Sequence, residues 1–430
     1  MNQLLKQRIA QLKNGEIPTG YKKTEFGIFP CDWEIVSIGS VSTNRGEYGL
    51  NAPARTKTDG LPKYIRITDI DENGNYVDNG ACVDYSDTNG QYTLKPGDIV
   101  FARTGASVGR NYLYKIKDGD LVFAGFLIKF SVDEKVSNPY IVYTNCNTKT
   151  YHDWVKKISA RSGQPGINAE EYCTYKFCKP KSLSEQAKIA EILMTWEKAI
   201  ELHKQQIGKL KQFKSVCLKK MFPAKGQTVP EWRFKGFTDA WEQRKWCNTV
   251  DISTEMVDPT SGEYDDMPHI APGNIESFTG RVLDNVKTVK EEHLISGKFR
   301  FRPGDVVYGK INPQLGKYFY AGVDGLTSAD AYVFNGKNGV TQKFLFSLLQ
   351  TDIFFKYSVS VSKRSGMPKI NRDELNEYSF LAPNEQEQER IGDFLLIIDN
   401  LITLHQRKVE TYQKQYRILQ QYLINGIVRV

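Results

Sequence analysis

The stretch LKPGDIVFARTGASVG, residues 94–109, returns as FRPGDVVYGKINPQLG at residues 301–316. In both copies a Pro-Gly-Asp turn precedes three apolar residues, at 99–101 and 306–308. A turn of this composition in front of Val, Ile and aromatic residues is typical of a short, buried β-strand. We therefore expect the two copies to form the same turn and strand in two similar domains.

Two further segments repeat in the same order along the chain. RSGQPGIN at 161–168 matches RSGMPKIN at 364–371 in six of eight positions, and EQAKIAEIL at 185–193 matches EQERIGDFL at 387–395. The Trp-Glu pair at 33–34 also returns at 241–242. Collinear matches about 205 residues apart indicate a tandem duplication whose period is too long for a solenoid.

A long helix is predicted after each domain, because residues 184–221 contain no proline and a single glycine. The seam positions alternate steps of four and three residues, which is the coiled-coil period, so we expect the two helices to pack together. The alternative is two ordinary amphipathic helices, each buried on its own domain. The predicted seam consists of Ile189, Leu193, Trp196, Ile200, His203, Ile207 and Leu210, followed in the second copy by Ile391, Leu395, Ile398, Ile402, His405, Val409 and Tyr412.

The repeat also predicts the direction of the helices. If the same contacts recur about a two-fold axis, the second helix runs antiparallel to the first. His203 and His405, at the midpoints, should then face each other, with Trp196 near Tyr412. LKQRIAQLKNGEIP at 5–18 resembles LKKMFPAKGQTVP at 218–230, so we expect the N-terminal segment to complete the helical region beside the first domain.

These observations predict an α+β fold with a pseudo-two-fold, cyclic tandem repeat. Two similar mixed α/β domains would be separated by two long antiparallel coiled-coil helices, each about 54 Å long at 1.5 Å per residue. The predicted boundaries are 1–20 for the N-terminal segment, 21–183 for the first domain, 184–222 for the first helix, 223–384 for the second domain and 385–430 for the second helix.

The composition is that of an ordinary globular protein. Of 430 residues, 40% are hydrophobic and 25% charged, which excludes wholesale disorder and fibrous classes. Apolar runs are too short for a membrane-spanning helix, and the N-terminus lacks the features of a secretory signal. Seven cysteines without a CxxC pair favour reduced thiols, and five scattered histidines make a local metal site improbable. We expect a cytoplasmic protein.

Positive charge gathers in one segment. The formal net charge is +8, and residues 202–230 carry seven lysines without one acidic residue. A basic segment of this kind suits the phosphates of a nucleic acid, to which we assign Lys219 and Lys220. The alternative is a solvated helix face.

The sequence contains no set of residues expected of an enzyme. It lacks the Asn/Asp-Pro-Pro-aromatic loop and glycine-rich turn of an amino-group DNA methyltransferase, and it lacks a GxxxxGK[ST] phosphate loop. Asp98 and Asp305 have no nearby acidic and lysine partners of a nuclease, so we interpret them as turn residues. We predict no catalytic residue, metal or cofactor in this chain.

Polar and basic loops follow the two Pro-Gly-Asp strands. Their flanks match while their interiors differ, as expected if two similar scaffolds contact different base edges. The RSG loops could hold phosphates. The alternatives are solvated hairpin tips and caps of the next element. The predicted DNA-binding residues are Arg103, Thr104, Ser107, Arg110, Arg161 and Ser162, together with Lys219, Lys220, Lys310, Asn312, Gln314, Lys317, Lys363, Arg364 and Ser365.

Taken together, these motifs resemble the specificity subunit of a type I restriction–modification enzyme. The resemblance rests on the duplicated PGD strands, the RSGxPxIN segments and the EQxxI start of each helix. It extends to the linker MFPAKGQTVPEWRFKGFTDAWEQ at 221–243 and to the C-terminal LINGIVRV. It implies that each domain recognises one half of a bipartite site in double-stranded DNA and that the helices act as spacers. Base-contacting residues do not carry over, because the recognition loops differ between family members.

The resemblance also implies partners in a bacterial or archaeal cytoplasm. Two modification subunits would bind S-adenosylmethionine and methylate adenine, and two restriction subunits would use ATP and Mg²⁺ to translocate and cleave DNA. No membrane is implied. Two alternatives remain open: the recognition portion of a different bipartite-site restriction or methylation enzyme, and a non-catalytic scaffold that binds proteins.

Overall fold

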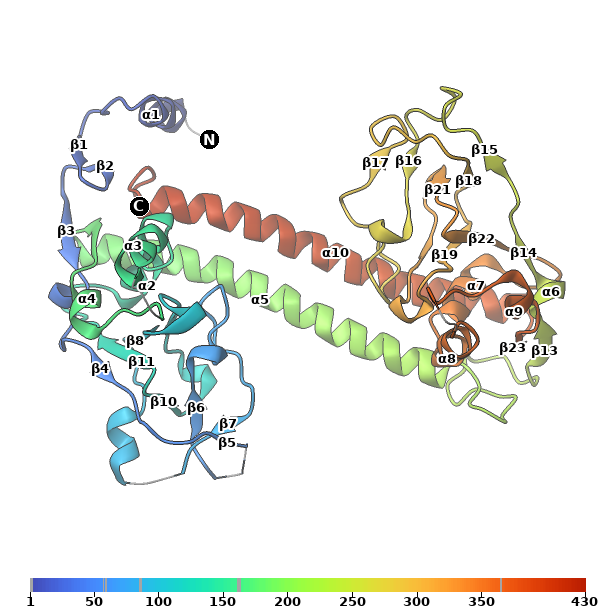
Figure 1. Ribbon diagram of the computed structural model, residues 1–430, viewed down its shortest axis with the longest axis horizontal. Helices are drawn as coiled ribbons and strands as arrows, with labels where there is room; N and C mark the ends of the chain where they lie inside the picture. Colours follow the sequence, from blue (N-terminus) through green and yellow to red (C-terminus); the bar gives the residue numbers. More distant parts are fainter. Residues whose placement is uncertain (1–2, 57, 59, 85–86, 161–163, 364–365) are drawn as a thin grey trace. The chain divides into compact units, whose positions relative to one another are not determined.

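The computed structural model describes residues 3–56, 58, 60–84, 87–160, 164–363 and 366–430. It divides into two compact units (Figure 1). Unit 1 comprises residues 1–199 and 412–430, and unit 2 comprises residues 200–411. Each unit contains β-sheets, short helices and a part of both long helices.

The strands of unit 1 form two four-stranded sheets and two two-stranded ones. They are β1 (Tyr21–Thr24), β2 (Gly27–Pro30), β3 (Trp33–Ser37), β4 (Glu47–Tyr48), β5 (Arg55–Thr56), β6 (Lys63–Ile65), β7 (Ala81–Cys82), β8 (Asp98–Ala102), β9 (Asn111–Leu113), β10 (Leu121–Phe123), β11 (Leu127–Ser131) and β12 (Lys176–Pro180). One sheet has the order β4-β11-β8-β9 and the other the order β10-β6-β7-β5, while β1 pairs with β2 and β12 with β3. All five residues of β8 are buried, which confirms the buried strand expected after the first Pro-Gly-Asp turn.

Unit 2 repeats this arrangement. Its strands are β13 (Glu242–Lys245), β14 (Val250–Ile252), β15 (Met256–Val257), β16 (Pro268–His269), β17 (Lys287–Thr288), β18 (Lys298–Phe301), β19 (Val306–Gly309), β20 (Tyr318–Tyr320), β21 (Gly325–Thr327), β22 (Ala331–Gly336) and β23 (Ser379–Ala382). The order β14-β22-β19-β20 matches β4-β11-β8-β9, and β13 pairs with β23 as β3 does with β12. The remaining sheet has the order β15-β18-β21-β16-β17. Like β8, β19 is buried throughout.

Short helices follow the sheets in matching positions. They are α2 (Pro139–Asn145), α3 (Lys149–Ser159) and α4 (Ala169–Cys173) in unit 1, and α7 (Gln342–Leu349), α8 (Asp352–Val361) and α9 (Arg372–Asn376) in unit 2. Outside this pattern, α1 (Gln3–Lys13) precedes β1, and α6 (Trp246–Thr249) lies between β13 and β14. The break between α7 and α8 lies at Thr351, which begins the second helix. Its hydroxyl oxygen accepts a hydrogen bond from the Phe354 N–H at 3.3 Å.

The long helices α5 (Leu183–Lys220) and α10 (Glu385–Ile424) run antiparallel within each unit. In unit 1 the rings of Trp196 and Tyr412 lie 5.4 Å apart. In unit 2 the rings of His203 and His405 lie 4.9 Å apart, with the two Nδ1 atoms at 2.8 Å. Both contacts were expected from the symmetry of the repeat, and both are confirmed.

Most apolar seam positions are buried in the cores of the two units, whereas Trp196, His203, Ile207, Leu210, His405 and Tyr412 are half-buried. Burial of this apolar stripe is the main source of helix stability, since isolated helices are marginal in water. The buried seam residues are Ile189 and Leu193 in unit 1, and Ile200, Ile391, Leu395, Ile398, Ile402 and Val409 in unit 2.

The last turns of α10 complete the core of unit 1. Leu423 and Ile424 are buried there, in the positions that Met221 and Phe222 occupy in the core of unit 2. The sequence comparison had given this place to the N-terminal segment. In the structure that segment contacts the end of the chain from outside, where the Arg8 guanidinium donates to the Ile427 carbonyl at 3.0 Å.

Candidate nucleic-acid interface

The aspartates of the two Pro-Gly-Asp turns are occupied in holding the turns. The Asp98 carboxylate accepts a hydrogen bond from the Lys95 N–H, and the Asp305 carboxylate accepts one from the Arg302 N–H, each at 2.8 Å. Both aspartates are therefore turn residues, as predicted. The expectation that Asp98 lacks nearby lysine and acidic partners is wrong, because Lys129 Nζ lies 4.0 Å from Asp98 and pairs with Glu47 at 2.9 Å. Each turn directs a buried strand towards the polar loop that follows it.

In unit 1 the loop after β8 is clamped between two remote segments. The Arg103 N–H donates to the Phe126 carbonyl at 3.1 Å, and the Arg103 carbonyl accepts from the Ile167 N–H at 2.9 Å. The Gly105 N–H donates to the Pro165 carbonyl at 3.0 Å. Residues 103–110 thus lie beside 164–167, and we call these two segments the paired loops of unit 1.

The same clamp recurs in unit 2 after β19. The Lys310 N–H donates to the Asp330 carbonyl at 2.9 Å, and the Lys310 carbonyl accepts from the Ile370 N–H at 3.0 Å. The Asn312 N–H donates to the Pro368 carbonyl at 2.8 Å. Residues 310–317 and 366–370 form the paired loops of unit 2. Each unit therefore brings the polar loop after its Pro-Gly-Asp strand beside the described end of the RSGxPxIN motif.

The two clamped residues carry cations that lie over aromatic rings. The Arg103 guanidinium carbon is 4.8 Å from the centroid of the Tyr48 ring, and Lys310 Nζ is 5.0 Å from that of Tyr332. A cation over a ring face is attracted by the ring quadrupole. The contact restricts each half-buried side chain to one region of the surface.

Charges of both signs surround Lys310. Burial lowers the pKa of its ammonium group, and the nearby charges of Lys369 and Arg372 lower it further, while Asp330 acts in the opposite direction. The guanidinium of Arg372 also approaches the Tyr332 ring, at 6.0 Å. Lys310, Lys369 and Arg372 together offer cationic groups to an anionic ligand such as a phosphate backbone.

The half-buried side chains of Arg110 and Lys317 each donate to a backbone carbonyl of their own unit. Arg110 Nη1 donates to the Ile70 carbonyl at 3.1 Å, and Lys317 Nζ donates to the equivalent carbonyl of Ile275. These bonds tie the paired loops to two short 3₁₀ turns that precede the carbonyls, at 67–69 and 272–274. Both side chains therefore hold the loop in place, and their contact with DNA stays a prediction.

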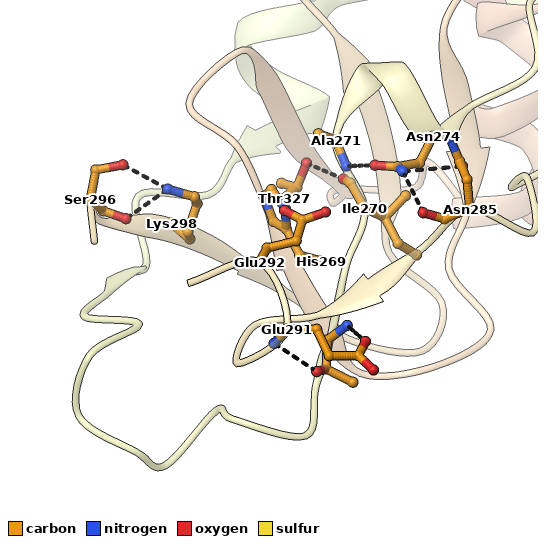
Figure 2. Close-up of polar contacts among 11 residues, drawn as sticks. His269, Ile270, Ala271, Asn274, Asn285, Glu291, Glu292, Ser296, Lys298 and Thr327 are labelled. Atoms are coloured by element: carbon orange, nitrogen blue, oxygen red, sulfur yellow. Dashed lines mark hydrogen bonds and ion pairs between the residues drawn. The ribbon is translucent and has the colours of Figure 1, made fainter. Parts of the chain in front are cut away.

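The neighbourhood of the second 3₁₀ turn is a polar network (Figure 2). The Asn274 side chain accepts from the Ala271 N–H at 2.9 Å and donates to the Asn285 side chain at 3.2 Å. Beside it, His269 Nδ1 lies 2.6 Å from Glu292 Oε2, and the imidazole is 5% exposed. The network fixes the turn whose following carbonyl binds Lys317.

The other predicted residues occupy varied positions. Thr104 and Ser107 are half-buried in the first pair of loops. In the second pair, the Gln314 amide donates to the Asn312 side-chain oxygen at 3.2 Å. Lys363, which precedes residues 366–370 in the sequence, is exposed. Arg161, Ser162, Arg364 and Ser365 lie outside the described residues.

The end of the RSGxPxIN motif starts a helix. The backbone N–H of Asn168 donates to the Glu171 carboxylate at 2.8 Å, and that of Asn371 donates to the Glu374 carboxylate at 2.7 Å. These are half of a capping box at the start of α4 and α9. Asn168 and Asn371 therefore cap the helices that follow them. Capping of the next element was the alternative to DNA binding stated for this region.

Lys219 and Lys220 lie at the end of α5. Lys220 Nζ donates to the Glu231 carboxylate at 2.6 Å and lies 5.0 Å from the centroid of the Trp232 ring. Lys219 is exposed and contributes to a cavity of about 770 Å³, which Lys211 also lines. Of the two, Lys219 is therefore the more available for contact with a phosphate.

Sequence reasoning missed four residues beside the candidate interface: Tyr48, Phe126, Asp330 and Tyr332. The two aromatic rings lie under the clamped cations. Phe126 and Asp330 immediately precede β11 and β22 and supply the carbonyls of the clamp. An alignment of the two copies of the repeat over these strands would have placed Phe126 opposite Asp330, two residues with different side chains.

Within the described ranges, no three His, Cys, Asp or Glu side chains gather into a group that could hold a metal ion. The prediction that this chain binds no metal or cofactor stays a prediction. No described helix combines the length and the apolar character needed to cross a membrane.

Comparison with known proteins gives consistent matches. The family described as "Type I restriction modification DNA specificity domain" matches residues 30–212 and 257–411. The chain is 30% identical over 237 residues to the type I restriction enzyme EcoDI specificity subunit of Escherichia coli, which covers 49% of this chain and 52% of that protein. It is 22% identical over 425 residues to the type I restriction enzyme MjaVIII specificity subunit of Methanocaldococcus jannaschii, covering 93% and 94%. The crystal structure of a type I restriction–modification system S subunit from M. genitalium shares the fold, with a TM-score of 0.64, 12% identity and coverage of 91% and 96%.

Proposed function

Because this chain belongs to the type I restriction–modification DNA specificity family, we propose that it recognises a bipartite site in double-stranded DNA, with one half of the site read by each unit. One observation carries the proposal: the two units repeat the same backbone clamp but differ in the side chains on it. Arg103 and Phe126 in unit 1 correspond to Lys310 and Asp330 in unit 2. A constant frame with variable polar and apolar tips suits the recognition of two different words through base edges.

The chemistry of the clamped cations supports contact with DNA. Arginine and lysine donate to guanine O6 and N7 in the major groove, and they also bind phosphates. The rings of Tyr48 and Tyr332 hold these cations without neutralising their charge. Each cation thus keeps its hydrogen-bond donors for a ligand.

We also propose that the long helices bind two modification subunits, which would supply S-adenosylmethionine and methylate adenine, and that two restriction subunits would add ATP- and Mg²⁺-dependent cleavage. Exposed apolar side chains support a docking role. On the helical segments of unit 2, Leu202 is 52% exposed and its repeat equivalent Leu404 is 48% exposed. Apolar side chains exposed at equivalent positions favour protein partners that bind twice.

The decisive experiment combines binding with methylome sequencing of cells that carry the complete system. We expect a motif of two short words separated by unread base pairs. Arg103→Ala should change recognition in one word and Lys310→Ala in the other, each by about 1–3 kcal/mol of discrimination. The purified chain alone should transfer no methyl groups. Methylation by the chain alone, or a single uninterrupted motif, would contradict the proposal.

A further inference from the structure

Phe126 and Asp330 occupy the same position in the two units. Each residue immediately precedes the strand that pairs with the Pro-Gly-Asp strand, and each carbonyl accepts the N–H of the clamped cation. The backbone is therefore constant at this position. The side chain changes from an aromatic hydrocarbon to a carboxylate.

Both side chains are available to a ligand. Phe126 is 59% exposed, and Asp330 is exposed. A single exposed apolar residue is common on protein surfaces and by itself implies nothing. The location is what distinguishes Phe126, because its carbonyl is bonded to the N–H of Arg103 at the tip of the paired loops.

We propose that this shared position determines base specificity in both halves of the site: Phe126 packs against the methyl group of a thymine, and Asp330 accepts a hydrogen bond from the N4 amine of a cytosine. The inference rests on the proposed function and deepens it by assigning residues and base pairs.

In unit 2 the neighbouring charges match the edge of one base pair. In the major groove guanine offers the O6 and N7 acceptors, and its partner cytosine offers the N4 donor. Lys310 can donate to the guanine, and Asp330 can accept from the cytosine. Lys310 and Asp330 are direct neighbours, because the Lys310 N–H donates to the Asp330 carbonyl at 2.9 Å, so the two residues can serve one G·C base pair.

In unit 1 the same position carries no hydrogen-bonding group. Arg103 keeps the donors that suit a guanine, but a phenyl ring beside it can neither donate to nor accept from a base edge. The apolar feature that the major groove offers to such a ring is the thymine C5-methyl group. The first word should therefore contain a thymine next to the base that Arg103 contacts.

The test uses the full chain with its modification subunits and duplexes built on the motif found by methylome sequencing. Each base pair of both words is replaced singly, and each thymine of the first word is also replaced by uracil, which lacks the methyl group. Phe126→Ala should lower the preference at one T·A base pair by about fourfold, the value of burying one methyl-sized apolar group. Uracil in place of the thymine at that base pair should weaken binding by the native chain and leave binding by Phe126→Ala unchanged.

Two variants test the carboxylate. Asp330→Ala should relax the preference at one C·G base pair of the second word, with every position of the first word unaffected. Asp330→Asn should shift that preference towards adenine, because an amide can bond to adenine N6 and N7. Ile116→Ala in unit 1, where Ile116 is 75% exposed, and Asp266→Ala in unit 2, where Asp266 is exposed, are the matched controls. Both controls should keep all base preferences.

The outcomes separate the two levels of the proposal. If the native complex shows no preference for a bipartite duplex, the proposed function fails. If the native complex is specific while Phe126→Ala and Asp330→Ala keep every preference and fold normally, this inference alone is wrong. A first word without thymine, or a second word without a G·C base pair, would also overturn it.

Discussion

The repeat places two carboxylates at equivalent positions of the long helices, and the two units accommodate them differently. In unit 1, Glu197 accepts hydrogen bonds from the hydroxyls of Tyr140 and Tyr416, at 2.7 and 2.8 Å. In unit 2, Asp399 pairs with Lys214, the repeat equivalent of Tyr416. The carboxylate at this helix position is therefore hydrogen-bonded by two neutral hydroxyls in unit 1 and paired with a lysine in unit 2.

The difference has an energetic consequence. Lys214 is 6% exposed and Asp399 is 8% exposed, and burial lowers the pKa of the lysine and raises that of the aspartate. Removing one member of a buried ion pair leaves an uncompensated charge, whereas removing one of two neutral donors leaves the carboxylate still bonded. The two helices therefore repeat the same apolar contacts, whereas the buried carboxylate has different bonding partners in each unit.

The largest expected effect on activity comes from an insertion that changes the heptad phase of one long helix and not of the other. Two residues inserted after His203 would shift the heptad phase of α5 and not that of α10, so we expect assembly and methylation to be lost. Seven residues at the same place would keep the phase and lengthen α5 by about 10 Å.

Methylome sequencing of the seven-residue variant checks this prediction. If the helices set the distance between the two words, both words should stay the same and the unread spacer should grow by about three base pairs, since a turn of 10–10.5 base pairs rises about 34–36 Å. An unchanged spacer at full activity would show that the helices do not set the separation.

The next effect tests the ion pair. Lys214→Met should destabilise the protein by about 3–5 kcal/mol, because the Asp399 carboxylate stays buried without its partner. The loss should be smaller at pH 5 than at pH 8, since a buried aspartate with a raised pKa can take up a proton as the pH falls. Denaturant unfolding of the native chain and of Lys214→Met at both pH values measures this loss of unfolding free energy. Lys214→Met combined with Asp399→Leu should recover most of the loss.

The neutral arrangement should be more tolerant. Tyr416→Phe removes one donor to Glu197 and leaves the Tyr140 hydroxyl in place, so we expect a loss of about 1.5 kcal/mol in the same unfolding experiment. Equal losses for Tyr416→Phe and Lys214→Met would mean that the two polar arrangements do not differ in energy.

The smallest effect concerns the histidines at the helix midpoints. Burial, together with the charges of His405 and Lys408, lowers the pKa of His203. A histidine with a lowered pKa binds protons better in the unfolded state, so its contribution to stability is complete above the unfolded pKa of about 6.5 and declines as the pH falls below it. Unfolding between pH 7.5 and 5.5 should show a shallower decline for His203→Gln than for the native chain. An identical decline would contradict the prediction.

Several features followed from sequence pattern because their causes are local or repeated. The Pro-Gly-Asp turns were predicted because Asp98 and Asp305 bond to backbone groups three residues away. The pairing of His203 with His405 was predicted because a symmetric repeat with one heptad phase allows one antiparallel register.

The duplication, the buried strands, the long helices and their antiparallel pairing could all be predicted from the amino-acid sequence, since each depends on residue spacing that is visible along the chain. The meeting of the paired loops, the bonds of Arg110 and Lys317 to backbone carbonyls, and the completion of the unit 1 core by the end of α10 became visible only in the folded chain. The folded chain also shows that Phe126 and Asp330 share a position. These features depend on hydrogen bonds and packing between segments remote in sequence, and backbone hydrogen bonds of that kind leave no mark on the identity of the residues that make them.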